Sequence, residues 1–243
     1  MPRPTDPSRD GHVALALSVL RTHHPEAEGA LWAGSLSRGE GTEMSDIDLV
    51  VLYPRLERAW RETLTEARIV ETFVHDLDSL DVFFEKDRDR GVPVLASMVA
   101  EGVALRDGPL VARARAAAAE SLAGGPTPWS TEDIDRSRYL LTDLRDDLRG
   151  DSDPRRLRAL GASLYEILLA HHRRCRGLWT AKSKAIPAFL SKEEPALAET
   201  YLTAFDQLFA SAEPAAVLAL IDTILVPTGG PFHRWHAVAP PHR

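Results

Sequence analysis

Apolar positions in the first half of the chain alternate between helical spacing and short continuous runs. Val13, Leu17 and Leu20 recur every three or four residues, which predicts an amphipathic helix over residues 12–22. Further helices are predicted at 55–66, 77–88, 93–100 and 109–123. Short apolar runs with β-branched residues predict strands at 29–33, 46–53, 69–74 and 103–106. This alternation indicates a small mixed sheet with helices on one face.

The second half carries helical spacing only. It follows Gly124-Gly125-Pro126-Thr127-Pro128, a sequence typical of a linker. Helices are predicted from Ser130 or Thr131 to residue 149, at 154–176, around Leu197, Tyr201 and Leu208, and at 215–225. Helices joined by short loops favour a bundle. We therefore expect an α+β fold with two domains, a mixed-sheet domain at 1–123 and an α-helical bundle domain at 124–243, with an irregular tail from residue 227.

Composition narrows the classes of protein that fit. The 243 residues are 44% hydrophobic and 27% charged, enough to bury a core. The formal net charge of −7 argues against nonspecific nucleic-acid binding, which relies on a basic surface. Residues 1–10 lack a signal-peptide core, and no apolar run approaches the roughly 18 residues of a membrane span. The single cysteine, Cys175, fits a reducing compartment. We expect a cytoplasmic protein with no nucleic-acid or membrane partner.

The candidate chemistry gathers in residues 33–53, AGSLSRGEGTEMSDIDLVVLY. Alternate residues of a strand share a face, so Asp46 and Asp48 should point the same way. Neighbouring carboxylates repel unless a cation lies between them, and Mg²⁺ suits carboxylate and phosphate oxygens. Upstream, Gly34 would let a ligand approach the backbone, and free N–H groups at Ser35 would favour an anion. The stretch therefore predicts a site for magnesium and phosphate.

Three pieces of this stretch together resemble the signature of a known superfamily. Gly34-Ser35, then Arg38-Gly39, then Ser45-Asp46-Ile47-Asp48-Leu49 look like the motif of the nucleotidyltransferases that include DNA polymerase beta. The form is most similar to the small bacterial branch of aminoglycoside (kanamycin-type) and minimal nucleotidyltransferases. The resemblance implies a nucleotidyltransferase domain at 1–123, with Gly34 and Ser35 on nucleotide phosphates. It also implies that Asp46 and Asp48 hold Mg²⁺ with a third carboxylate from a neighbouring strand.

Glu71 is the candidate for the third carboxylate. It interrupts the apolar strand IVETFV, where a charge is costly unless it is paired or bound to metal. Many resembling proteins have Asp at this place, so the longer Glu71 would act as metal ligand, as general base, or as both. The rivals Asp76, Asp78 and Asp81 fall at a predicted helix start, where an acid is ordinarily a cap or a partner of the helix dipole.

The helical half offers a few polar candidates. Lys182 and Lys184 follow Trp179, and in resembling enzymes a lysine in such a segment reaches the nucleotide phosphates. We assign Lys184 to nucleotide binding, with a solvated loop as the alternative. One acid of Asp143, Asp146 and Asp147 would face an acceptor, unless all three belong to a solvated helix face. Adjacent His171 and His172 point to different sides of a helix, which disfavours zinc.

The resemblance implies Mg²⁺-dependent transfer of a nucleoside monophosphate, AMP from ATP, to a hydroxyl of a small molecule. Aminoglycoside-like antibiotics are the acceptors that the family suggests, which would make the chain an antibiotic-resistance enzyme. Two other functions fit the same residues. One is transfer to a protein acceptor, as in toxin–antitoxin pairs, and the other is a nucleotide-binding regulator without catalysis.

Overall fold

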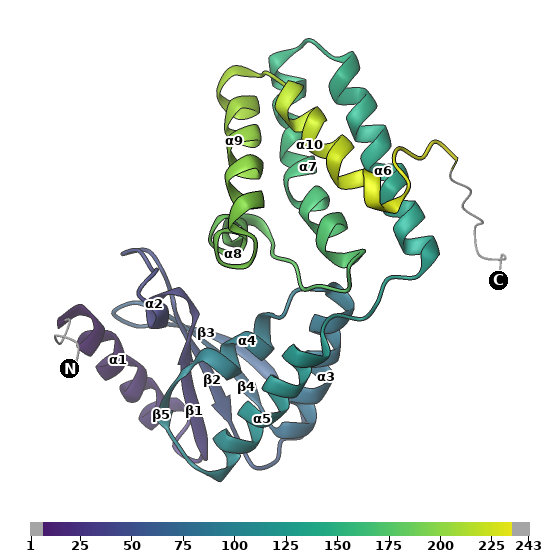
Figure 1. The fold of residues 1–243 in the computed structure, drawn as a ribbon. Helices are drawn as coiled ribbons and strands as arrows, with labels where there is room; N and C mark the ends of the chain where they lie inside the picture. The colour runs from purple at the N-terminus through teal and green to yellow at the C-terminus, as the bar shows by residue number, and fades with distance from the viewer. Residues whose placement is uncertain (1–6, 235–243) are drawn as a thin grey trace, which may run out of the picture. The chain divides into compact units, whose positions relative to one another are not determined.

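The structure is a computed structural model that describes residues 7–234 (Figure 1). The chain divides into two compact units, Met1–Gly125 and Pro126–Arg243. The boundary along the chain falls within the segment 124–128, which contains glycine and proline. Of the expected irregular tail, residues 235–243 lie outside the described part of the chain, as do residues 1–6 of the N-terminal segment. Within residues 7–234, no helix combines the length and the apolar character needed to cross a bilayer.

The first unit is built on a five-stranded mixed sheet of order β3-β4-β2-β1-β5. The strands are β1 (Gly29–Ala33), β2 (Ile47–Leu52), β3 (Trp60–Thr65), β4 (Ile69–His75) and β5 (Val103–Arg106). Neighbouring strands are antiparallel except β2 and β4, which run parallel with Asp48 opposite Glu71. The α+β prediction is confirmed, and four of the five strands were expected from the sequence.

Helices cover both faces of this sheet, so the prediction of helices on one face was wrong (Figure 1). Three helices, α3 (Leu77–Arg90), α4 (Val94–Glu101) and α5 (Pro109–Gly124), pack on the face that carries Val50 and Leu52. On the opposite face, α1 (Pro7–His23) packs against Leu49 and Val51. Covering both faces is what the continuous apolar run of β2 requires, since every β2 residue except Asp48 is buried.

The edge strand β3 corrects a second prediction, that of a helix over residues 55–66. The sequence WRETLT alternates between exposed and half-buried side chains, as an edge strand does, and a short turn at 66–68 joins it to β4. Its density of charged residues suits the outer face of a helix and the open edge of a sheet equally well, because both are solvated. Pairing with β4 decides between them.

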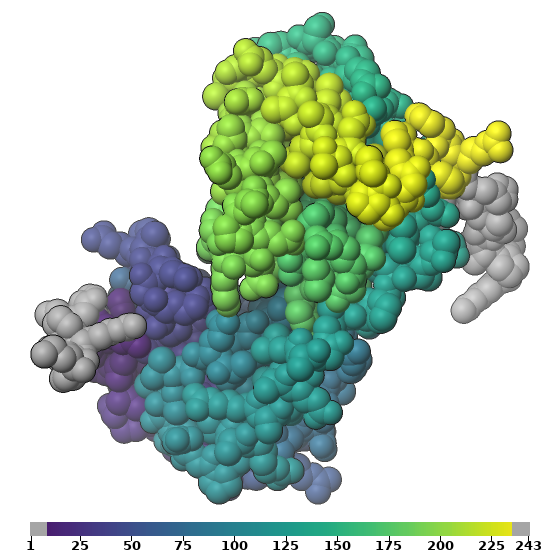
Figure 2. All heavy atoms as spheres, in the orientation of Figure 1, coloured from purple at the N-terminus to yellow at the C-terminus, as the bar shows by residue number. Residues whose placement is uncertain are grey.

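Over its described residues, 126–234, the second unit has helices and no strands. It contains α6 (Thr131–Gly150), α7 (Pro154–Arg174), α8 (Ile186–Glu193), α9 (Pro195–Ser211) and α10 (Ala215–Leu225). Ser130 forms a capping box with Asp133, and Asp153 caps α7, as polar residues before apolar spacing should. Tyr201 and Phe205 of α9 lie in the core, and α9 and α10 lie against each other in the space-filling view (Figure 2). The short helix α8 was not anticipated, because its two turns carry too few apolar positions to establish a period.

Glu194 forms contacts with α7 whose contribution to the stability of this unit depends on pH. It lies between α8 and α9 and accepts from His172 at 2.9 Å and from Arg173 at 2.5 Å, both on α7. Burial alone would raise the pKa of Glu194, but these hydrogen bonds outweigh it and lower the pKa to about 2. A depressed carboxyl pKa stabilises the fold above the unfolded value of 4.5, and that stabilisation is lost as pH falls toward about 2.

We therefore expect the free energy of unfolding to fall between pH 5 and pH 2.5 more steeply in wild type than in Glu194→Gln. The difference should be on the order of 1–3 kcal/mol, since Glu194 is partly solvated and its pairs are weakened accordingly. Urea denaturation at several pH values measures it. Glu199→Gln, at an exposed position of α9, is the control and should follow wild type. Parallel curves for Glu194→Gln and wild type would contradict the assignment.

Candidate active site

The loop between β1 and β2 begins with a sharp change of backbone direction at Gly34. β1 ends at Ala33 and the short helix α2 (Gly34–Arg38) follows at once, with Gly34 at φ +76°. The Ser37 hydroxyl donates to the Gly34 carbonyl at 2.8 Å and holds this turn. Gly39 ends α2 in the left-handed conformation, at φ +77°. Ser35, the second predicted phosphate residue, is thus the next residue after a glycine that the turn itself requires.

Gly34 is also in close contact with one of the predicted metal acids. Ala33 is the antiparallel partner of Asp48, so the chain enters α2 beside that carboxylate. A Cβ atom on Gly34 would lie 1.9 Å from the Asp48 Oδ2 atom, far inside van der Waals contact. The missing side chain therefore makes room for the Asp48 carboxylate itself. Sequence reasoning assigned Gly34 to the nucleotide phosphates and did not anticipate this second role.

Asp46 lies just before β2, because the strand begins at Ile47 and not at residue 46 as predicted. The turn that precedes it is held by Arg68, from the β3–β4 turn. Arg68 Nη1 donates to the carbonyls of Glu43 at 2.6 Å and Ser45 at 2.7 Å, with a longer contact to Thr42 at 3.5 Å. Arg68 thus fixes the backbone that presents Asp46. The sequence gives no signal for this, because the contact spans more than twenty residues.

Glu71 lies directly opposite Asp48 in the parallel pair of β2 and β4. Opposite residues of a parallel pair share a face, so both carboxylates project from the same side of the sheet. Glu71 forms an ion pair with Arg61 of β3, with 2.5 Å between Arg61 Nη2 and Glu71 Oε2. The Arg61 guanidinium also lies 5.0 Å from the centre of the Phe73 ring. The structure thus brings Gly34, Asp48 and Glu71 together.

The donor set fits Mg²⁺ in chemistry and in register. Carboxylates are the ligands that Mg²⁺ prefers, and Asp48 and Glu71 occupy opposed positions of adjacent strands. As the side chains stand, no group of three His, Cys, Asp or Glu within residues 7–234 is close enough to hold a metal ion. Glu71 is turned to Arg61 instead. Asp46, Asp48 and Glu71 therefore lie near the start of β2, but their carboxylates are not close enough together to coordinate one metal ion.

The rival acid Asp76 serves the fold. It is the N-cap of α3, where its carboxylate accepts from the Ser79 backbone N–H at 2.9 Å and from the Leu56 N–H at 2.9 Å. Burial would raise the pKa of Asp76, but these hydrogen bonds outweigh it and lower the pKa. All of its bonds go to residues that shape α3 and the loop before β3, as expected for an acid at a helix start.

In the second unit, the segment after Trp179 is organised by Glu166 of α7. Lys182 pairs with Glu166 at 3.8 Å, and the Ser183 N–H donates to the same carboxylate at 3.2 Å while Ser183 adopts φ +46°. Lys184 lies in the 3₁₀ turn Ser183–Ala185 and is exposed. Within the part of the chain that the structure describes, the Lys184 ammonium has no ion-pair partner. Lys182 is therefore held in an ion pair with Glu166, whereas Lys184 is exposed to solvent.

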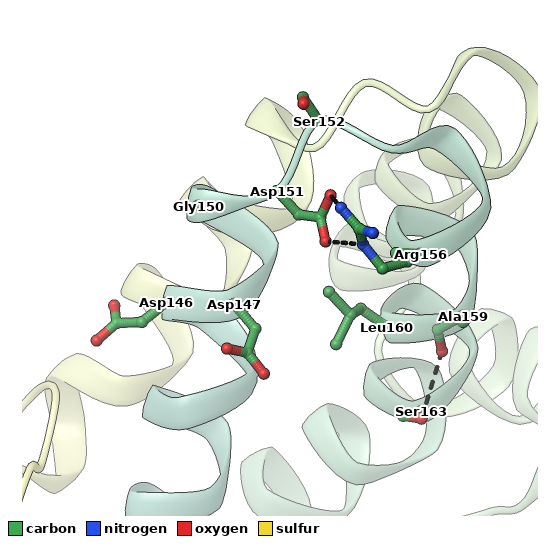
Figure 3. Close-up of a pocket in the computed structure, with 9 residues that line it drawn as sticks. All are labelled: Asp146, Asp147, Gly150, Asp151, Ser152, Arg156, Ala159, Leu160 and Ser163. Carbon is green, nitrogen blue, oxygen red and sulfur yellow. Dashed lines mark hydrogen bonds and ion pairs between the residues drawn. The ribbon is translucent and has the colours of Figure 1, made fainter.

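The three acids of α6 also differ from one another. Asp146 pairs with Arg145 at 3.0 Å and with His233 at 3.8 Å, and together with Asp147 it lines a hollow between α6 and α7 (Figure 3). Asp151, at the end of α6, is bound to Arg156 on the rim of that hollow. Asp143 is exposed. Of the three predicted acceptor acids, Asp146 and Asp147 both line this hollow.

The contact between Gly34 and Asp48 leads to a matched pair of variants. Gly34→Ala should displace the Asp48 carboxylate, because the new Cβ would overlap Oδ2, and should lower divalent-cation affinity at least about tenfold. Gly39→Ala has the same positive φ but nothing within 4 Å of the added Cβ, so it should carry only the backbone strain of about 1 kcal/mol. Calorimetric Mn²⁺ titration of both variants makes the comparison. Equal affinities in the two would show that Gly34 leaves the Asp48 carboxylate unconstrained.

No curated protein matches the chain. Among solved structures, a nucleotidyltransferase-like protein from Exiguobacterium sibiricum 255-15 matches at 13% sequence identity, over 89% of this chain and 75% of that one, with a TM-score of 0.38. Residues 17–96, which contain Gly34, Asp46, Asp48 and Glu71, match the family model described as a nucleotidyltransferase domain, and the prediction of such a domain is confirmed for that stretch.

Proposed function

We propose that the chain is a Mg²⁺-dependent nucleotidyltransferase that moves AMP from ATP to a hydroxyl of a small molecule. One observation carries this proposal. Asp48 and Glu71 stand opposite each other on the same face of β2 and β4, with Gly34 against Asp48, inside the stretch that matches the nucleotidyltransferase domain. Paired carboxylates beside a glycine turn are what metal-assisted transfer of a phosphate group needs.

In this proposal Asp46 and Asp48 hold the metal, and Glu71 completes the set or acts as base. Bound Mg²⁺ would neutralise charge on the phosphate oxygens. The turn at Gly34 and Ser35 receives the triphosphate, because a glycine backbone can approach it closely and the Ser35 hydroxyl can donate to it. The closed side of the site is supplied by α3, α4 and α5, which cover the apolar continuation of β2.

The chemical step is a displacement at the α-phosphorus of ATP. The acceptor oxygen forms a new P–O bond there, and the bond from the α-phosphorus to the bridging oxygen breaks, releasing pyrophosphate. The acceptor loses its hydroxyl proton, and Glu71 is the proposed base. Its side chain is mostly but not fully buried, so it can pass the proton on to water.

The acceptor class rests on the resemblance and on charge. Aminoglycoside-like molecules are polycations that carry many hydroxyls, and an acidic protein of net charge −7 attracts a cation. The test is a screen of hydroxyl acceptors with labelled ATP and GTP, with product mass as the readout. Pyrophosphate release that depends on Mg²⁺ and on an acceptor supports transfer. If ATP binds tightly but no pyrophosphate is released with any acceptor, including a protein acceptor, the chain is a nucleotide-binding regulator instead.

We expect Asp48→Asn and Asp46→Asn each to reduce turnover at least about a hundredfold. Loss of a principal charge contact in such a site costs about 3 kcal/mol of barrier or more. The metal-free melting temperature should stay the same or rise, because the substitution relieves like-charge repulsion. Acceptor-dependent pyrophosphate release and thermal melting measure the two effects. An asparagine variant with more than about a tenth of wild-type turnover would exclude that residue as a metal ligand.

Lys184 remains our proposed phosphate-binding residue of the second unit. Lys184→Ala should weaken ATP binding about fivefold or more, the scale of one charge-assisted contact. Lys182→Ala is the matched control, because Lys182 already pairs with Glu166 and its loss should leave ATP affinity within about twofold. Isothermal titration with a nonhydrolysable ATP analogue measures both. Equal effects of the two substitutions would mean that only the net charge of the segment matters.

A further inference from the structure

We infer that Arg61 is the counter-ion of Glu71 in the metal-free protein and that it competes with the divalent cation for that carboxylate. The inference rests on the proposed function, because it takes Asp48 and Glu71 as the place where the cation binds. It assigns a role to a residue of β3 that no sequence motif contains. In the metal-free protein the Arg61 guanidinium takes the place of the cation beside Glu71. Binding of the metal therefore includes release of Arg61 from that carboxylate.

Arg61 and the two acids lie on three neighbouring strands, β3, β4 and β2. Arg61 of β3 is the antiparallel partner of Phe73, two residues along β4 from Glu71. Residues two apart on a strand share a face, so Arg61, Phe73 and Glu71 project from the same side as Asp48. Arg61 reaches diagonally to Glu71, with 2.5 Å between Nη2 and Oε2. Within residues 7–234, no other hydrogen bond or ion pair is seen for the Glu71 carboxylate.

The two carboxylates need a positive charge beside them. Glu71 and Asp48 are opposed residues of neighbouring parallel strands, and like charges in that arrangement destabilise a sheet. The Glu71 side chain is only 17% exposed, so water screens it weakly. A positive group beside Glu71 removes part of this repulsion. In the structure that group is the Arg61 guanidinium, and the cation is expected to satisfy the same requirement.

Arg61 can move away from Glu71. Its side chain is 58% exposed, so breaking the pair returns the guanidinium to solvent at little cost in solvation. The face of the Phe73 ring, 5.0 Å away, gives it a second favourable contact that does not involve Glu71. A guanidinium cannot be neutralised by deprotonation, so a cation approaching Glu71 meets a fixed positive charge until Arg61 moves. Competition therefore follows from the charges.

The alternative role is orientation, in which Arg61 stays bound and holds Glu71 for the metal, as outer contacts of metal ligands often do. The two roles predict opposite changes when Arg61 is replaced. Under competition, Arg61→Gln tightens cation binding. Under orientation, the same substitution weakens it. Arg61→Lys keeps the charge and should keep most of the competition, which a merely structural role of the arginine would not predict.

The test is Mn²⁺ binding to the nucleotide-free protein, with free Mn²⁺ followed by electron paramagnetic resonance. Arg61→Gln should bind Mn²⁺ about threefold to tenfold more tightly than wild type. The matched control is Arg58→Gln, which removes the same charge from an exposed position of the adjacent loop, and it should change the affinity less than twofold. In a Glu71→Gln background, Arg61→Gln should give no gain. Thermal melting adds a second readout, because metal-free Arg61→Gln should melt lower than wild type and recover with Mn²⁺.

Each outcome decides something. Unchanged or weaker Mn²⁺ binding in Arg61→Gln overturns the competition, and an equal gain in Arg58→Gln reduces it to a long-range charge effect. Asp48→Asn separates the inference from the proposed function. If Asp48→Asn abolishes Mn²⁺ binding while Arg61→Gln does not tighten it, only the role of Arg61 fails. If Asp48→Asn leaves Mn²⁺ binding intact, the cation binds elsewhere and the metal assignment and the role of Arg61 both fail.

Discussion

The parallel pairing of β2 and β4 is the constraint on which the site depends. It sets Asp48 opposite Glu71. Such a pair cannot form through a tight hairpin, because a hairpin would make the two strands antiparallel. A parallel neighbour requires a crossover, and here the chain runs out to the sheet edge as β3 before it returns as β4. The same excursion that brings the second carboxylate into place therefore delivers Arg61 beside it. One topological requirement supplies both the like charges and their counter-ion.

Burial explains why the acids stand out within an otherwise apolar strand. Five of the six β2 residues are buried, with helices on both sides of the sheet, and Asp48 is the exception. A carboxylate in such a strand costs free energy unless it has partners, and the space for it comes from the missing Cβ of Gly34. The turn at Gly34 and the acid at Asp48 are thus one local arrangement, since a side chain at position 34 would overlap the Asp48 carboxylate.

Sequence patterns predicted the parts of this molecule that depend on local spacing. The bounds of β1, β5 and α10, and the start of α6 next to Ser130, follow from residues within a few positions of one another. β3 was misread because its partner strand, rather than its own composition, makes it a strand. Arg61, Arg68 and the contact of Gly34 with Asp48 were not foreseen for the same reason, because each depends on register between strands. Register is set by pairing, which one-dimensional periodicity does not contain.

The β3–β4 hairpin supports the site with two arginines that act on different kinds of atom. Arg68 donates to neutral backbone carbonyls before Asp46, so it can hold that turn without opposing a cation at the carboxylates. Arg61 donates to the carboxylate of Glu71, which the cation would also bind. Both arginines donate charge-assisted hydrogen bonds, but only Arg61 donates to an anionic oxygen for which a cation would compete, so only the Arg61 contact would be exchanged for the metal. A single hairpin can in this way fix one acid in place and leave the other available.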